Sequence, residues 1–451
     1  MRSWCSRAVI AAAAMAACQF TRNETQIDGA RPDVAPPLPD AGPCVTTSAE
    51  CASADVLRVC ATAGGSAVDT TCSWGCRSDD GAAHCALLSP SGGSVTPTDT
   101  VGSDVGSATL NNATIDQSTG AIANGATNRA AGTGVIGGID FELRNGVGVF
   151  RFGDLVIQGN LSFTGTGPVA LVSTGSITVT AAIDGIGNCV GATGGPGGSP
   201  GGIGHTSAAG SGGGEAGTDD TLGASGGGYG AVGGSGGDAG GELAVPGGPA
   251  FGDPTIAILA GGGGGGGGNG GNPFGGGGGG AIQLVANQTL TITAPASINA
   301  GGCGGTSGTA VTDTGGGGGA GGSILLEAHD ITVNGWLAVN GGGGGGNYYD
   351  NPPCTTSTAR GANGALSRTP ATGVGGCAAN GGAGGAANLA AGAGLDGPYM
   401  GVGDYAAGGG GAVGRIRFNT RSGSAAVDNT QLSPALDDNP TTCTAGSANT
   451  Q

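Results

Sequence analysis

The chain has 451 residues, of which 108 are glycine, 4% are aromatic and 10% are charged. The glycines gather in runs between residues 185 and 414 without a Gly-X-Y period, which excludes a collagen triple helix. The formal charge is −17, and the 14 basic residues are all arginine. Because phosphate binding needs clustered basic side chains, this composition excludes nucleic acid as a partner.

Residues 1–17 are predicted to be a lipoprotein signal peptide. Arg2 and Arg7 precede an apolar stretch that is too short to span a bilayer. The stretch ends in Met-Ala-Ala-Cys, which resembles a bacterial lipobox with Cys18 as the lipidated residue. Gln19, rather than Asp, follows the cysteine and favours sorting to the outer membrane. The alternative is cleavage by ordinary signal peptidase, which would give a secreted protein with a spare thiol at Cys18.

Residues 18–43 are rich in proline and are predicted to form an extended tether. Residues 44–86 form a six-cysteine module, in which an even number of cysteines in so short a segment predicts a disulfide framework. The candidates are Cys44, Cys51, Cys60, Cys72, Cys76 and Cys85. The sequence does not choose among their possible pairings. A zinc site is the competing idea, with candidate ligands Cys72, Cys76, His84 and Cys85, but no Cys-x2-Cys knuckle supports it.

Residues 87–106 are predicted to be a second linker, residues 107–425 a strand-rich domain, and residues 426–451 a C-terminal tail. Within the domain, residues 281–300 align on residues 323–339 as three short alternating runs, and residues 169–185 repeat the same triplet. Such a repeat predicts an all-β fold, a right-handed parallel β-helix with long glycine-rich excursions in which each triplet is one coil. The alternative is a β-sandwich built from the same strands.

The glycine runs are expected at the surface, as excursions from the coil turns that are in part disordered. Glycine lacks a Cβ, so the runs can also pack backbone against backbone. They carry no Gly-Lys-Ser/Thr phosphate loop, and residues 233–238 match the calcium-binding nonapeptide only in part. Five further cysteines are present, an odd number that leaves at least one unpaired: Cys189, Cys303, Cys354, Cys377 and Cys443.

No catalytic motif, metal site or cofactor is predicted. Exported β-helix enzymes use carboxylates, and the candidates here would be Asp184, Glu327 and Asp330, which we interpret as ordinary solvated positions. The three histidines, His84, His205 and His329, share no motif with a nucleophile. Four aromatic residues could stack on sugars and are interpreted as packing residues: Trp336, Tyr348, Tyr349 and Tyr405.

The lipobox, the proline-rich tether, the six-cysteine module and the glycine-rich repeats together resemble large glycine-rich surface lipoproteins of myxobacteria and their relatives. Residues 408–420 and 432–434 also fit this resemblance. It implies an outer-membrane or cell-surface location without an assigned activity. We therefore predict a non-enzymatic surface lipoprotein with a structural, adhesive or matrix-contact role. The expected partners are the membrane, through the lipid anchor, and surface polysaccharide or other envelope components. The alternatives are an exported carbohydrate-active β-helix enzyme, either a polysaccharide lyase or a hydrolase, and a passive envelope filler.

Overall fold

The structure is a computed structural model that describes residues 44, 48–78, 81–186, 188–241, 243–309, 313–347, 359–375, 379–397 and 405–451. It is all-β with a disulfide-rich N-terminal region, as predicted. The helices of this part of the chain are two short 3-10 turns, η1 (Pro97–Thr100) and η2 (Asn429–Gln431). Five residues of the sequence-based predictions lie outside the described residues: Cys18, Tyr348, Tyr349, Cys354 and Cys377.

Contacts divide the described chain into two compact units, one with residues 48 and 59–68 together with Cys44, and one with residues 49–58 and 69–451. The six-cysteine module contains five short strands: β1 (Ser48–Ser53), β2 (Val56–Cys60), β3 (Val68–Thr71), β4 (Cys76–Arg77) and β5 (His84–Cys85). Its disulfides are Cys44–Cys60, Cys51–Cys76 and Cys72–Cys85. The predicted disulfide framework is therefore confirmed. The three cysteines of the competing zinc site, Cys72, Cys76 and Cys85, all form disulfides and are not available as metal ligands.

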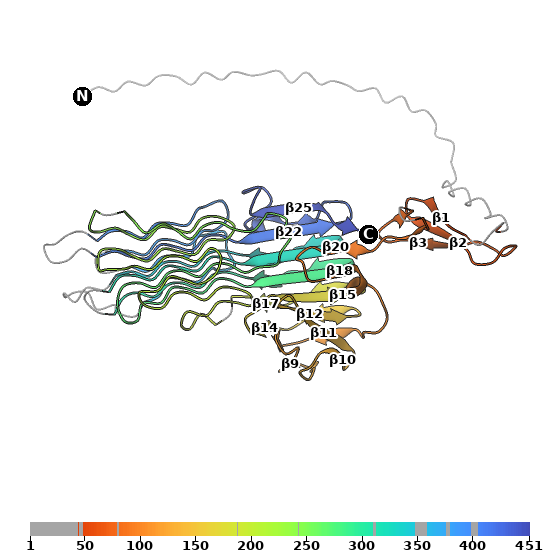
Figure 1. Cartoon of the computed structure of the whole chain (residues 1–451), viewed down its shortest axis with the longest axis horizontal. Helices are drawn as coiled ribbons and strands as arrows, with labels where there is room; N and C mark the ends of the chain where they lie inside the picture. The colour runs from red at the N-terminus through yellow and green to blue at the C-terminus, as the bar shows by residue number, and fades with distance from the viewer. Residues whose placement is uncertain are drawn as a thin grey trace, which may run out of the picture. The chain divides into compact units, whose positions relative to one another are not determined.

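The second unit is an array of strands in which consecutive triplets pair in parallel (Figure 1). The first runs of the triplets contribute β12 (Val147–Phe152), β15 (Val169–Ser173), β18 (Ala281–Ile292), β20 (Ser323–Val333), β22 (Arg415–Thr420) and β25 (Cys443–Ser447). The second runs contribute β7 (Ala108–Leu110), β13 (Leu155–Ile157), β16 (Ile177–Val179) and β23 (Ala426–Val427), together with the second halves of β18 and β20. With the antiparallel β10 (Gly134–Ile136) and β11 (Ile139–Arg144), these strands form a twelve-stranded sheet that curls like half a barrel.

The third runs form a separate seven-stranded sheet. Its strands are β8 (Ala113–Asp116), β9 (Ile122–Ala123), β14 (Leu161–Thr164), β17 (Ala182–Asp184), β19 (Ser297–Asn299), β21 (Trp336–Ala338) and β24 (Leu432–Ser433). Two regions expected outside the domain take part in the sheets. Residues 426–451 supply β23, β24, β25 and β26 (Asn449–Thr450), and β26 pairs with β6 (Leu88–Ser89) from the expected second linker.

The register of the strands reproduces the repeat seen in the sequence. Leu284 pairs with Leu171 on one side and with Leu326 on the other. In the third run, Ser297 pairs with Trp336. The predicted alignment of the repeated units is thus confirmed residue by residue. The right-handed parallel β-helix stays a prediction.

Both faces of the central strands are buried, because alternate side chains point to opposite sides of a strand. Ile282, Leu284 and Ala286 of β18 belong to the main apolar core, which continues through β20 and β22. Ala281 and Val285 face the other way and pack in a second apolar cluster with Trp74, Leu88 and Ile256. Each fully buried aliphatic side chain contributes about 1.5–3 kcal/mol. Residues of the six-cysteine module and of later segments therefore pack together on the outer face of the sheet.

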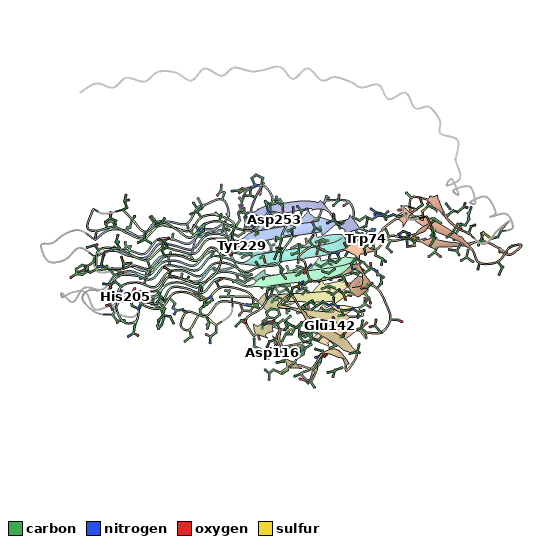
Figure 2. The ribbon with its side chains drawn as sticks, in the orientation of Figure 1. Trp74, Asp116, Glu142, His205, Tyr229 and Asp253 are labelled. Carbon is green, nitrogen blue, oxygen red and sulfur yellow. A yellow bond between two sulfur atoms is a disulfide. The ribbon has the colours of Figure 1, made fainter. Side chains whose placement is uncertain are left out.

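The glycine runs are not surface excursions. Residues 261–268 and 315–322 are buried throughout. They run as extended chains beside one another at one end of β18, β20 and β22, and Tyr229 lies where these chains meet the strands (Figures 1 and 2). We call the mutually hydrogen-bonded segments the glycine bundle: residues 194–202, 212–217, 223–237, 261–280, 300–308, 313–322, 339–346, 381–394 and 406–414.

The hydrogen bonds of the glycine bundle repeat every three residues. The amides of Gly316, Gly319 and Gly322 donate to the carbonyls of Thr306, Cys303 and Ala300 at 2.8–2.9 Å. The amides of the residues between them donate, again at intervals of three residues, to residues 263–266 and to residues 409–412. In all, residues 315–322 exchange hydrogen bonds with six described segments: residues 224–227, 263–266, 276–279, 300–306, 342–345 and 406–415. A period of three residues is that of the polyproline II helix, so the bundle packs threefold helices side by side.

Close packing explains why these positions are glycine. A Cβ on Gly266 would lie 1.9 Å from the carbonyl oxygen of Glu215, and one on Gly319 would lie 2.1 Å from that of Gly277. The obstructing atoms belong to the backbone and cannot rotate away. A disulfide joins Cys303 of the glycine bundle to Cys189, which is 114 residues away in the sequence. Among the described cysteines, Cys443 is free and is buried in the main core.

Candidate functional site

The three candidate carboxylates do not form a site. Asp184 lies at the end of β17 in the seven-stranded sheet, whereas Glu327 and Asp330 lie on β20 in the twelve-stranded sheet. The expectation that Glu327 is solvated is wrong, because the residue is only 1% exposed. It follows Leu325 on the outer face of β20 and is covered by the segment around Ser91.

Glu327 is held by three donors. Its Oε1 accepts from the backbone N–H of Ser91 at 3.0 Å and from Nδ2 of Asn419 at 2.8 Å. Its Oε2 accepts from Nε2 of Gln283 at 2.7 Å. Burial raises the pKa of Glu327, and these hydrogen bonds oppose the rise without cancelling it. A carboxyl group enclosed in this way has no access to a substrate.

The remaining candidates are also separated. His84 lies in β5, and His205 lies among the glycine segments, away from the strands (Figure 2). Trp336 lies in β21, and Tyr405 is buried. Residues 233–237 of the partial calcium motif are part of the glycine bundle. Within the described residues, no group of three or more His, Cys, Asp or Glu side chains could hold a metal ion.

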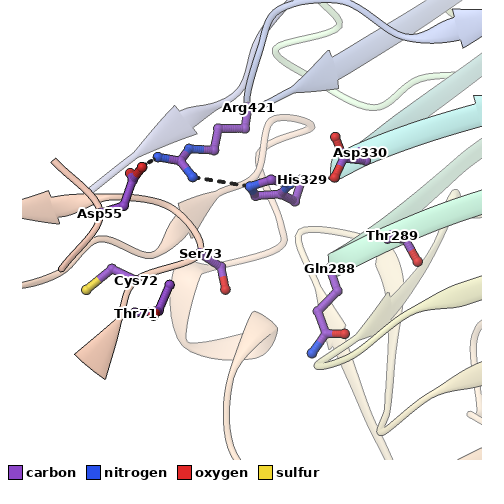
Figure 3. A pocket seen from close by; sticks show the side chains of 9 residues that line it. All are labelled: Asp55, Thr71, Cys72, Ser73, Gln288, Thr289, His329, Asp330 and Arg421. Carbon is purple, nitrogen blue, oxygen red and sulfur yellow. Dashed lines mark hydrogen bonds and ion pairs between the residues drawn. The ribbon is translucent and has the colours of Figure 1, made fainter. Parts of the chain in front are cut away.

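His329 lines a hollow, together with residues of the six-cysteine module (Figure 3). The hollow has a volume of about 380 Å³, and its polar lining includes Asp55, Ser73, Gln288, His329, Asp330 and Arg421. We call it the His329 hollow. It lies at the corner between the first and second runs of the triplets, where β18 carries a bulge between Ala286 and Thr289. A bulge re-aims the side chains around it, which explains why the polar groups converge there.

The charged groups of the His329 hollow already have partners. Nδ1 of His329 lies 2.7 Å from Oδ2 of Asp330, and Nε2 lies 3.3 Å from Nη1 of Arg421. Because a guanidinium can only donate, Nε2 accepts, and Nδ1 carries the proton that is donated to Asp330. Arg421 also forms an ion pair with Asp55. Both nitrogens of His329 are thus engaged, and neither is placed to take a proton from a nucleophile.

The His329 hollow lies between residues of the six-cysteine module, including Asp55 and Ser73, and the sheet. The ring of Trp74 packs edge-on against His329, with 5.6 Å between the ring centroids. Its Nε1 donates to Oδ1 of Asn287 at 2.8 Å. Trp74, Arg421 and Asp55 were not identified from the sequence as residues of this site. The repeat carries the missing signal, since positions that follow the same run in successive triplets, such as Gln288, His329 and Arg421, must stack at one corner.

No family model, curated protein or solved structure matches the chain. In the part of the chain that the structure describes, no helix has the length and apolar character of a membrane span. The four disulfides are of the kind found in exported proteins.

Proposed function

We propose that the protein is an exported, non-enzymatic surface lipoprotein whose glycine bundle is a rigid scaffold for structural, adhesive or matrix contacts. The observation that carries this proposal is the enclosure of residues 315–322 by six hydrogen-bonded segments. A segment bonded on every side cannot bend independently of its neighbours. A large part of the chain thus forms a rigid structure without reactive side chains, which is the property that a scaffold requires.

We further infer that the triplets are successive coils of a parallel β-helix. The pairing of the strands supports this inference. The first, second and third runs of residues 281–300 each pair in parallel with the corresponding run of residues 323–339. The register shifts only at the bulge. A β-sandwich pairs its strands antiparallel. A right-handed path is the expected hand for parallel strands joined within one sheet.

The location is proposed from the lipobox together with the disulfides. Lipidation of Cys18 would anchor the chain in the outer membrane, and the proline-rich residues 18–43 would hold the folded part away from it. The proposed partners are the membrane and surface polysaccharide or other envelope components.

The experiment compares the wild type with Cys18→Ala by intact mass, membrane fractionation and surface labelling of whole cells. The proposal predicts acyl mass on the wild type, its recovery in the outer membrane and its labelling from outside. The variant should lose the acyl mass and appear in the medium. Recovery of both proteins in the medium without acyl mass would overturn the anchor, and the protein would then be secreted.

The adhesive role is tested on cells that carry the protein with an intact or a disrupted bundle. Gly266→Val introduces a side chain where a Cβ would lie 1.9 Å from the carbonyl oxygen of Glu215, whereas Gly271→Val lies in open space. The proposal predicts that cells with the first variant lose cohesion or surface attachment and cells with the second keep it. Equal attachment in both, at equal surface amounts, would contradict a scaffold role.

A further inference from the structure

A second hollow lies on the outer face of the sheet, over β22. It has a volume of about 360 Å³, and its polar lining consists of Ser91, Thr255, Arg417, Asn419, Ser447 and Asn449. We call it the Arg417 hollow. No carboxylate lines it, in contrast to the His329 hollow, where Asp55 forms an ion pair with Arg421. Its volume is at the lower end of the range of small-molecule sites.

The guanidinium of Arg417 has free donors in this hollow. Its Nε donates to Oδ1 of Asn419 at 2.7 Å. Nη1 and Nη2 have no hydrogen-bond partner among the described residues, although the side chain is half-buried. Arginine stays charged in proteins, so Nη1 and Nη2 of Arg417 can each donate charge-assisted hydrogen bonds to a ligand.

Asn419 and Gly446 fix the position of the Arg417 guanidinium. Asn419, which accepts from Arg417 through its Oδ1, donates through its Nδ2 to Glu327 at 2.8 Å and to Oγ of Ser91 at 3.2 Å. Gly446 of β25 leaves the space for the guanidinium, because a Cβ there would lie 2.3 Å from Nη2. These contacts orient the free N–H groups of Arg417 before a ligand binds. Less conformational entropy is therefore lost on binding.

Two carboxyl groups, those of Glu327 and Asp253, act electrostatically on Arg417. Glu327 is enclosed by its own donors, as described above. Asp253 accepts from the backbone N–H groups of Thr255 at 2.8 Å and of Ala257 at 3.3 Å, so its carboxylate is turned to its own loop. The more distant charges behind the net −17 are screened, because the Debye length is about 8 Å at physiological ionic strength.

We propose that the Arg417 hollow binds the carboxylate of an acidic sugar residue, of the uronic acid class, in a polysaccharide. The free nitrogens of Arg417 pair with the two carboxylate oxygens, which is the geometry in which arginine binds carboxylates most strongly. The hydroxyl and amide groups of Ser91, Thr255, Ser447 and Asn449 match the hydroxyl groups of the sugar ring. This inference rests on the surface role proposed above and names the chemistry of its partner.

The test is a titration of the purified full chain with trigalacturonate and, as matched ligand, its neutral methyl ester. The inference predicts binding of the acid and not of the ester. Arg417→Gln should weaken binding by about 10- to 100-fold, since it removes charge-assisted hydrogen bonds. The matched control is Arg421→Gln, because that guanidinium is already paired with Asp55 in the other hollow and its loss should leave binding unchanged. Gly446→Ala should weaken binding without removing the charge.

Three results would overturn the inference: no binding of trigalacturonate by the wild type, unchanged binding by a folded Arg417→Gln, or equal losses in Arg417→Gln and Arg421→Gln. Tighter binding of a sulfated trisaccharide than of trigalacturonate would overturn the assignment to a carboxylate. Circular dichroism and amide exchange of the glycine bundle are recorded on the same samples. Failure of the sugar site with an intact bundle is thereby distinguished from failure of the scaffold itself.

Discussion

Gly265 and Gly317 touch backbone to backbone inside the glycine bundle: a Cβ on Gly265 would lie 2.2 Å from the carbonyl oxygen of Gly317. Both residues belong to runs that are buried along their whole length. The contact shows that a glycine run can form an interior without side chains. Its stability comes from hydrogen bonds and close contact between chains rather than from apolar side chains.

Gly265→Ala is predicted to destabilise the protein by about 1–3 kcal/mol or more, because the added methyl group meets a backbone atom that no rotamer change can move. The matched control is Gly271→Ala, where an added Cβ has no neighbour within 4 Å. Denaturant unfolding of both variants measures the difference. Equal stability of the two would show that residues 261–268 are not packed in solution.

Loss of the Cys189–Cys303 disulfide is predicted to loosen the glycine bundle. Ordering a residue costs about 1–2 kcal/mol, and a hydrogen bond returns about 0.5–1.5 kcal/mol, so a bundle of glycines needs additional constraint. The disulfide closes a loop with a sequence separation of 114 residues, for which the typical stabilisation is about 2–4 kcal/mol. The double variant Cys189→Ser, Cys303→Ser should lose this amount in denaturant unfolding. An unchanged unfolding midpoint would contradict the prediction.

Because of Glu327, the free energy of unfolding is predicted to decrease as the pH rises. Because burial raises the pKa of Glu327 above its value in the unfolded chain, its contribution is complete below the unfolded pKa and is lost as the pH rises through the folded pKa. The slope between these two values is about −1.4 kcal/mol per pH unit. Unfolding of the wild type and of Glu327→Gln is compared at several pH values above 4. Parallel pH profiles would show that the pKa is not raised.

Asp99 is predicted to act in the opposite direction. Burial alone would raise its pKa, but hydrogen bonds from Arg144 and from Thr96 outweigh burial and lower it. Its contribution is therefore present above the unfolded pKa and is lost as the pH falls through the folded pKa. Asp99→Asn should cost about 1–3 kcal/mol at pH 7 and less near pH 3. A cost that does not change with pH would argue against an ionised Asp99.

The strand array could be predicted in detail because each unit repeats the apolar pattern of the unit beside it. Aligning Leu284 with Leu326 in the sequence was enough to find the pair that the strands form. The glycine bundle could not be predicted in the same way. A residue without a side chain carries no sign of burial, and the period of three lies in the hydrogen bonds rather than in the residue types.

The two hollows were also beyond the sequence. Arg417 and Arg421 are four residues apart and look equivalent in the chain. Their difference depends on Asp55, which is distant in the sequence and pairs with Arg421 alone. Glu327 was misjudged for a similar reason, because the segment around Ser91 that covers it comes from the expected linker.

Amide hydrogen exchange of the native protein shows whether the glycine runs form an ordered scaffold. We expect residues 261–268 and 315–322 to exchange only through opening of the whole bundle, with protection close to that of β18 and β20. We expect faster exchange at Gly271, which is exposed. Exchange of the two runs at the rate of an unfolded chain would show that the glycine bundle is not an ordered scaffold.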